Sequence, residues 1–115
     1  MVEPRLKSKL TIAAWLRIAD AAGKPGMVLK RGDPDAGAIL MVLRGRAGTL
    51  VLSQTRNAAG DEAWIRLSGT DPIDQAATDA LIARQIRFDS DIWAVEFESP
   101  DLEPPVPLRL IDRKS

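Results

Sequence analysis

The stretch Arg31-Gly32-Asp33-Pro34-Asp35-Ala36-Gly37 lies between two apolar runs that predict β-strands. Its Asp-Pro-Asp centre is typical of a tight turn, because aspartate can hydrogen-bond its own backbone and proline presets φ. The stretch also brings two carboxylates, a guanidinium group and two glycines close together, which is more than a simple connection needs. It therefore indicates both a chain reversal and the place to look for a functional site.

Working outward from this turn, the hydrophobic periodicity and the turn residues predict two helices and five strands. The predicted elements are a helix over Leu10–Ala22, strands over Met27–Arg31, Ala38–Leu43, Thr49–Gln54 and Glu62–Ser68, a helix from Asp71 to about Arg87, and a strand over Asp91–Glu98. This order, α-β-β-β-β-α-β, predicts an α+β fold with a single, mostly antiparallel five-stranded sheet and two helices packed on it. We expect the strands to follow one another as a simple meander.

Three finer predictions concern the later part of the chain. Asp71 is expected to be the N-cap of the second helix, whose apolar side would comprise Ile73, Ala76, Ala77, Ala80, Leu81 and Ile82. Alternation along the last strand predicts that it is half-buried. Residues 1–100 would form the domain and residues 101–115 a Pro-rich C-terminal tail, rather than a core element, from which Leu108–Ile111 can dock as a short edge piece.

A meander gathers distant charged turns at one rim of the sheet. The turn at residues 32–37, the loop at 55–61 and the connection at 87–91 are all expected at that rim. The candidate binding site comprises Arg31, Asp33, Asp35, Arg84, Arg87, Asp91 and Trp93, with Gly32, Pro34 and Gly37 shaping the turn.

Each charged group at this rim has two interpretations. Asp33 and Asp35 can form a metal-binding pair with Asp89 or Asp91, or they can cap the turn and pair with Arg31 or Arg84. The arginines can form an anion site, since guanidinium groups bind carboxylate and phosphate bidentately. Alternatively, Arg84 reaches across to the turn and locks it.

Composition excludes several classes of chemistry. The 115 residues include no cysteine and no histidine, so a disulfide, a thiol nucleophile, a Cys/His zinc site and an imidazole base are impossible. Sixteen basic and sixteen acidic residues cancel, which disfavours broad binding to nucleic acid. The longest apolar run, Ala38–Leu43, is far shorter than the roughly 20 residues that span a bilayer. We expect a soluble cytoplasmic protein with no cofactor and no membrane contact.

Three segments together resemble a small family of bacterial proteins, the domain of unknown function 1491. They are Arg31–Ala38, Ile82–Gln85 and Asp91–Glu96, read as RGDPDAGA, IARQ and DIWAVE. The resemblance covers roughly Arg5 to Glu98 and excludes the tail. It implies a fold and no mechanism, because no activity is established for the family.

Three functions remain open. The sequence favours a non-enzymatic binding or interaction domain that uses the Asp/Arg rim to bind a partner protein or a small anionic ligand. The first alternative is a hydrolase or nuclease with an oxygen-ligated divalent metal on Asp33, Asp35 and Asp91. The second is a homodimer or a larger assembly that pairs through the first or fifth strand as an edge, with Glu96 and Glu98 protecting that edge.

Overall fold

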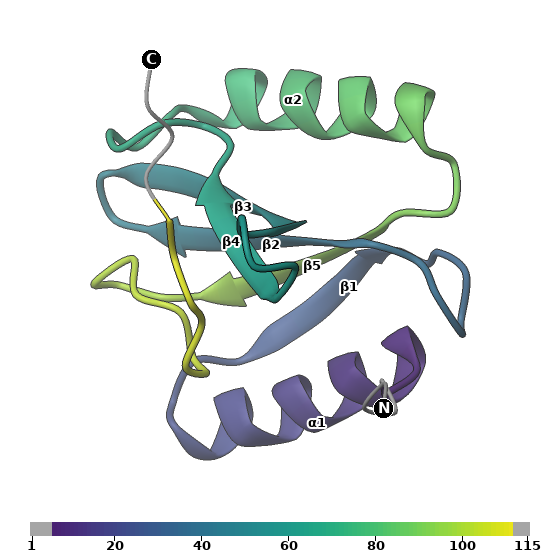
Figure 1. Ribbon diagram of the computed structural model, residues 1–115. Coiled ribbons are helices and arrows are strands. Elements are labelled where there is room, and N and C mark those ends of the chain that lie inside the picture. The colour runs from purple at the N-terminus through teal and green to yellow at the C-terminus, as the bar shows by residue number, and fades with distance from the viewer. Residues whose placement is uncertain (1–5, 112–115) are drawn as a thin grey trace.

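The fold is a five-stranded sheet with one helix on each face (Figure 1). The computed structural model describes residues 6–111. The elements are α1 (Ser8–Ala21), β1 (Gly26–Lys30), β2 (Ile39–Gly45), β3 (Gly48–Arg56), β4 (Glu62–Arg66), α2 (Gln75–Phe88) and β5 (Trp93–Glu98). The predicted α+β class, element order and mostly antiparallel sheet are confirmed, since β2–β5 is the one parallel pair among the five strands of residues 6–111. Residues 1–5 and 112–115, where the predicted domain and tail begin and end, lie outside the described residues.

The strands do not form the simple meander that we expected. The spatial order is β1-β5-β2-β3-β4, so the last strand is inserted between the first two. Val95 of β5 pairs with Val28 of β1 on one side and with Met41 of β2 on the other. Helix α2 carries the chain from the outer strand β4 back across the sheet to this inner position, which gives β5 partners on both sides.

Insertion between two strands also explains why β5 is buried rather than half-buried. Residues 93–97 are buried throughout, whereas the predicted alternation required every second side chain to be exposed. Glu96 is only 9% exposed, and its Oε1 lies 3.1 Å from Nη2 of Arg44. A buried carboxylate needs such a partner. The prediction that Glu96 and Glu98 protect an edge strand is therefore wrong, because the edges are β1 and β4.

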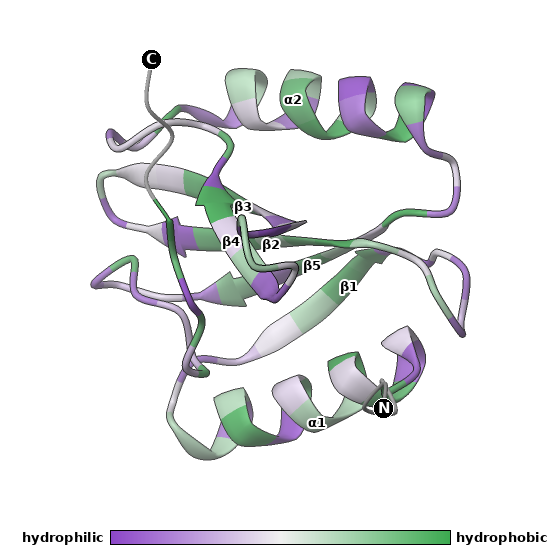
Figure 2. Cartoon of the chain, in the orientation of Figure 1, coloured by the Kyte–Doolittle hydropathy of each residue, from purple (hydrophilic) through white to green (hydrophobic). Residues whose placement is uncertain are grey.

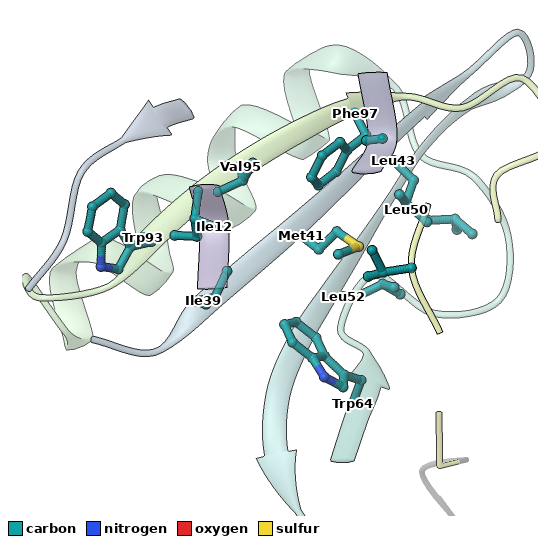
Figure 3. Packing of buried hydrophobic residues seen from close by; sticks show 12 residues of the cluster. Ile12, Ile39, Met41, Leu43, Leu50, Leu52, Trp64, Trp93, Val95 and Phe97 are labelled. Atoms are coloured by element: carbon teal, nitrogen blue, oxygen red, sulfur yellow. The ribbon is translucent and has the colours of Figure 1, made fainter. Parts of the chain in front are cut away.

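The sheet separates two layers of apolar side chains. The layer under α1 contains Met41, Trp64 and Phe97 from the sheet and Ile12 from the helix (Figure 3). The smaller layer under α2 contains Leu40, Val42, Val51, Ile92 and Ala94, against which Leu81, Ile82 and Ile86 of the helix pack. Figure 2 shows hydrophobic residues along β2 and β5 between the two helices. Because β2 and β5 contribute to both layers, side chains of both alternation phases are buried in each strand, and the run Ile39–Leu43 of β2 is continuously apolar.

The second helix begins three residues later than predicted. Ile73 exchanges two backbone hydrogen bonds of 2.9 Å with Thr49 of β3, which holds this part of the chain extended. Asp74, not Asp71, is the N-cap, and its carboxylate accepts from the amide of Ala77 at 2.8 Å. Consequently Ala76, Ala77 and Ala80 are exposed, and Thr78 is the buried residue of the helix.

The Pro-rich C-terminal segment packs against the sheet. Val106 is buried in the α1 layer, with Leu102, Leu108 and Leu110 around it, so the proline content did not reveal this contribution to the core. Leu110 forms a parallel bridge with Trp64 of β4, which confirms that part of Leu108–Ile111 docks at an edge. The amide of Trp64 donates to Arg109, and the amide of Ile111 donates to Trp64, each at 2.8 Å.

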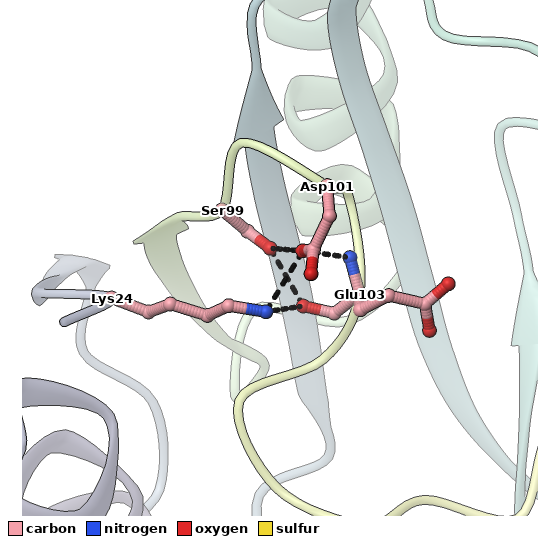
Figure 4. A network of polar contacts seen from close by, with 4 residues as sticks. All are labelled: Lys24, Ser99, Asp101 and Glu103. Atoms are coloured by element: carbon pink, nitrogen blue, oxygen red, sulfur yellow. Dashed lines mark hydrogen bonds and ion pairs between the residues drawn. The ribbon is translucent and has the colours of Figure 1, made fainter. Parts of the chain in front are cut away.

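A polar network anchors the start of this segment (Figure 4). The carboxylate of Asp101 accepts from Nζ of Lys24 at 2.8 Å, from Oγ of Ser99 at 3.0 Å and from the amide of Glu103 at 3.0 Å. The Lys24 ammonium group also donates to the Glu103 carbonyl at 3.1 Å. These bonds, led by the one from Lys24, lower the pKa of Asp101 from 3.8 to about 2. The network thus ties the α1–β1 connection to the segment that follows β5.

Replacing Asp101 should change how the melting temperature depends on pH. Because folding lowers the pKa of this carboxyl group, its contribution to stability is fully present above about pH 4 and is lost as the pH falls towards 2. Asp101→Asn should therefore melt at a lower temperature than the wild type at pH 6, and the difference should shrink between pH 4 and pH 2. Thermal melting across this range measures it. Asp20→Asn, an exposed position on α1, is the control, and a gap that stays constant with pH would contradict the prediction.

Candidate functional site at the rim of the sheet

The Arg31–Gly37 stretch crosses the start of β5. Since β1 and β2 flank β5, their connection has to pass over the end of the strand between them. It does so closely: the amide of Asp33 donates to the carbonyl of Asp91 at 2.9 Å. A Cβ added to Gly32 or Gly37 would collide with that same carbonyl oxygen, so both positions require glycine for space.

Asp33 is used to shape this crossing. Its carboxylate accepts from the amides of Ala36 at 2.8 Å and Asp35 at 3.3 Å, as in the turn that the sequence predicted. Its carbonyl accepts from Nε1 of Trp93 at 2.7 Å. Asp33 therefore joins the loop to the first residue of β5.

The same loop caps the N-terminus of α1. Lys7 stands at the N-cap and provides no side-chain cap, so the first amides of the helix need other acceptors. The carbonyls of Pro34 and Asp35 accept from the amides of Lys9 at 3.0 Å and Ser8 at 3.3 Å. The Ser8 hydroxyl donates to the carbonyl of Gly37 at 2.6 Å. We did not predict this role, and the absence of a capping side chain before the helix was the available signal.

The structure brings together most, but not all, of the predicted site residues. Arg31, Asp33, Asp35, Asp91 and Trp93 meet at the rim, and the Arg31 guanidinium lies 5.9 Å from the centre of the Trp93 ring. Arg84 and Arg87 are exposed on α2. Within residues 6–111, neither of these two arginines forms an ion pair, so Arg84 does not lock the loop.

The carboxylates of the rim do not converge. The Asp35 carboxylate lies 3.6 Å from Nζ of Lys7, and the Asp89 carboxylate accepts from the amide of Asp91 at 3.0 Å. Among the described residues, no three acidic side chains are grouped as a metal ion would require. The geometry therefore gives no support to the metal-dependent hydrolase.

Lys30 is a residue whose role the sequence did not reveal. Its ammonium group donates to the carbonyls of Ser90 at 2.7 Å, Arg31 at 3.0 Å and Ile92 at 3.1 Å. The end of β1 is thus fastened to the α2–β5 connection. A lone lysine at the end of a short apolar strand is also typical of a solvated edge, which is why its pattern carried no signal.

A cleft of about 290 Å³ opens between α1, the rim and the C-terminal segment. Its lining residues are Leu6, Ser8, Thr11, Trp15, Ile39, Gln54, Glu62, Pro107 and Leu108. Gln54 and Glu62 come from the β3–β4 hairpin, whose loop we expected at this rim. A neighbouring hollow of about 240 Å³ shares these two residues and extends to Ala36 and Ala38.

Comparison with known proteins identifies the family. The family described as a protein of unknown function (DUF1491) matches residues 6–107. This chain belongs to that family. The match extends past Glu98, where our resemblance ended, and so includes part of the C-terminal segment. Among curated proteins, none matches this member of the DUF1491 family.

Solved structures of bacterial proteins share the DUF1491 fold. A crystal structure of a DUF1491 family protein from Caulobacter crescentus CB15 is 28% identical, with a TM-score of 0.82 over 93% of this chain and 100% of that one. An NMR structure of a DUF1491 family protein from the same organism is 26% identical, with a TM-score of 0.82 over 95% and 99%. The solution structure of protein Atu0922 from A. tumefaciens is 28% identical, with a TM-score of 0.78 over 96% and 98%.

No helix within residues 6–111 of this DUF1491 protein is long and apolar enough to cross a membrane.

Gly32→Ala should destabilise the protein by about 2–3 kcal/mol, because the new methyl group would displace the loop from the carbonyl of Asp91. Gly60→Ala provides the control. Gly60 has a φ of +86° but open space around its Cβ position, so only backbone strain of about 1 kcal/mol is expected there. Urea unfolding measures both free energies. Equal losses would show that the loop does not depend on its close approach to β5.

Proposed function

We propose that this protein is a non-enzymatic interaction domain, resident in the cytoplasm, that docks an extended acidic and apolar segment of a partner protein along β1. The observation that carries this proposal is the exposure of large apolar side chains along β1 and at the end of α2. Met27 is 56% exposed, Leu29 is 42% exposed and Phe88 is 79% exposed. Large apolar side chains beside arginine are typical of the centre of protein interfaces.

The backbone of β1 supports this proposal, because within residues 6–111 the strand has a neighbour on one side only. The backbone amide of Glu98 donates to the carbonyl of Pro25. In an antiparallel pair, every second residue directs its amide and carbonyl towards the partner strand. The backbone groups of Met27 therefore face β5, and those of Gly26 and Val28 face outward. The other edge, β4, is covered by the bridge from Leu110. An extended segment of a partner can therefore pair with β1 through a few backbone hydrogen bonds.

Two features adapt this edge to side-chain recognition. A bulge between Val28 and Lys30 ends the regular ladder, so backbone pairing alone is short. A lysine on an edge strand usually disfavours pairing with another strand. The Lys30 ammonium group instead donates to the carbonyls of Ser90 and Ile92. The exposed side chains of Met27 and Leu29 are therefore the main source of binding energy.

The charge next to the end of β1 favours an acidic partner. The carboxylates of Asp33 and Asp89 accept backbone amides and that of Asp35 lies beside Lys7, so none of these three pairs with Arg31 among the described residues. The guanidinium group of Arg31, next after β1, has only the Trp93 ring beside it among the described residues. An unneutralised guanidinium group attracts carboxylates and can bind them bidentately. The strand is also an open surface, which suits an extended chain better than a small ion.

The proposal can be tested with two blocked peptides of equal length, one alternating glutamate and valine and the other lysine and valine. The acidic peptide should shift NMR resonances of Gly26–Arg31 and Phe88, and added salt should weaken its binding. Arg31→Ala and Phe88→Ala should each weaken it roughly three- to tenfold, since peripheral charges and apolar anchors contribute about this much.

Arg46→Ala is the matched control, because Arg46 is exposed in the opposite β2–β3 turn. It should leave binding unchanged. Equal binding of the basic peptide, or shifts confined to other surfaces, would overturn the proposal. Self-association of the protein through β1 in the absence of peptide would assign this edge to a second copy of the chain instead.

A further inference from the structure

We infer that the cleft between α1, the β3–β4 hairpin and the C-terminal segment is a binding site for a small organic ammonium compound with an apolar body. This site is separate from the β1 edge and does not depend on it. Its volume of about 290 Å³ lies at the lower end of the range for small-molecule sites, which limits the ligand to about one ring or a short alkyl chain.

Charge is the first reason for a cationic ligand. Among the residues that the structure describes, Glu62 is the only ionisable side chain in the lining of the cleft. Arg56 stands directly opposite Glu62 in the sheet, but its guanidinium group donates to the carbonyl of Gly60 at 2.8 Å. Within residues 6–111, Glu62 forms no ion pair. The cleft therefore has a negative charge that the described chain does not neutralise.

Hydrogen-bonding capacity is the second reason. Gln54 is held from both ends: its Oε1 accepts from the amide of Ile39 at 3.2 Å, and its Nε2 donates to Oε1 of Glu62 at 2.7 Å. The Ser8 hydroxyl hydrogen is committed to the carbonyl of Gly37, which leaves lone pairs on Oγ. The second Nε2 hydrogen of Gln54, the Trp15 indole N–H and the Thr11 hydroxyl are the donors in the lining, and the lone pairs of Glu62, Ser8, Thr11 and Gln54 outnumber them. Such a lining binds an N–H-rich group and leaves an anion poorly solvated.

The walls of the cleft suit the apolar part of the same ligand. Leu6, Ile39, Pro107 and Leu108 line it, and half-buried Trp15 adds an aromatic ring. An ammonium group is attracted to the face of an indole ring. Trp15 is held in place by Trp64, whose ring centre lies 5.6 Å away. The Trp15 side of the cleft is therefore supported by the core, in which Trp64 is buried.

The experiment compares three probes that share a phenylethyl-type shape: phenethylammonium, 2-phenylethanol and phenylacetate. Each is titrated into the full chain and followed by NMR shifts of Ser8, Trp15 and Glu62 together with tryptophan fluorescence. Phenethylammonium should bind in the cleft roughly three- to tenfold more tightly than 2-phenylethanol, because the charge on Glu62 is partly screened by water. Phenylacetate should bind most weakly.

Glu62→Gln should remove the preference for phenethylammonium over 2-phenylethanol while leaving the binding of the alcohol unchanged. Glu98→Gln, an exposed carboxylate at the end of β5, is the matched control and should keep the preference. Thermal melting of each variant checks that it is folded. Equal affinity for the ammonium and the alcohol in the wild type, binding of none of the probes, or a preference that survives in Glu62→Gln would overturn the inference.

Discussion

The structure depends on one geometric constraint: the connection between β1 and β2 has to pass over the start of β5. This follows from the order β1-β5-β2, in which the last strand of the chain separates the first two. Only a residue without a side chain fits against the carbonyl of Asp91, which explains Gly32 and Gly37. The connection then lies where it can satisfy the first amides of α1. One loop therefore fixes the position of a helix and of the inner strand β5.

The same constraint changes the meaning of the charged motif. Clustered carboxylates suggest a metal or an acid–base pair, but a carboxylate is also a strong acceptor for backbone amides. Asp33 uses that capacity to shape the turn, and Asp35 lies against Lys7. Because the acids serve the fold, Arg31 forms no ion pair among the described residues and lies against the Trp93 ring. The acids of the motif thus support structure, and the proposed recognition role falls to Arg31.

The two edges of the sheet are treated differently. Residues of the C-terminal segment close the β4 edge through Leu110 and bury Val106, and the Lys24–Asp101 network holds the beginning of that segment in place. Among the described residues, the β1 edge has no such cover, and Met27 and Leu29 are exposed there. Covering β4 also creates the wall of the cleft, through Pro107 and Leu108. The C-terminal segment therefore shapes one surface and leaves the other open to a partner.

The sequence by itself determined the helices, the strands and the turn at Asp33–Asp35, because periodicity and turn chemistry act over a few residues. The predicted meeting of that turn with Trp93, 60 residues away, is also observed, although it was argued from strand order. The meeting did not require the meander that we assumed, since the ends of β1 and α2 and the starts of β2 and β5 share one rim in the observed order as well. Only the tertiary structure decided that β5 is an inner strand, that Asp74 caps α2 and that residues 102–110 join the core. These outcomes depend on which distant backbone groups pair, and the residue pattern of β5 fits an outer strand as well as an inner one until its partners are known.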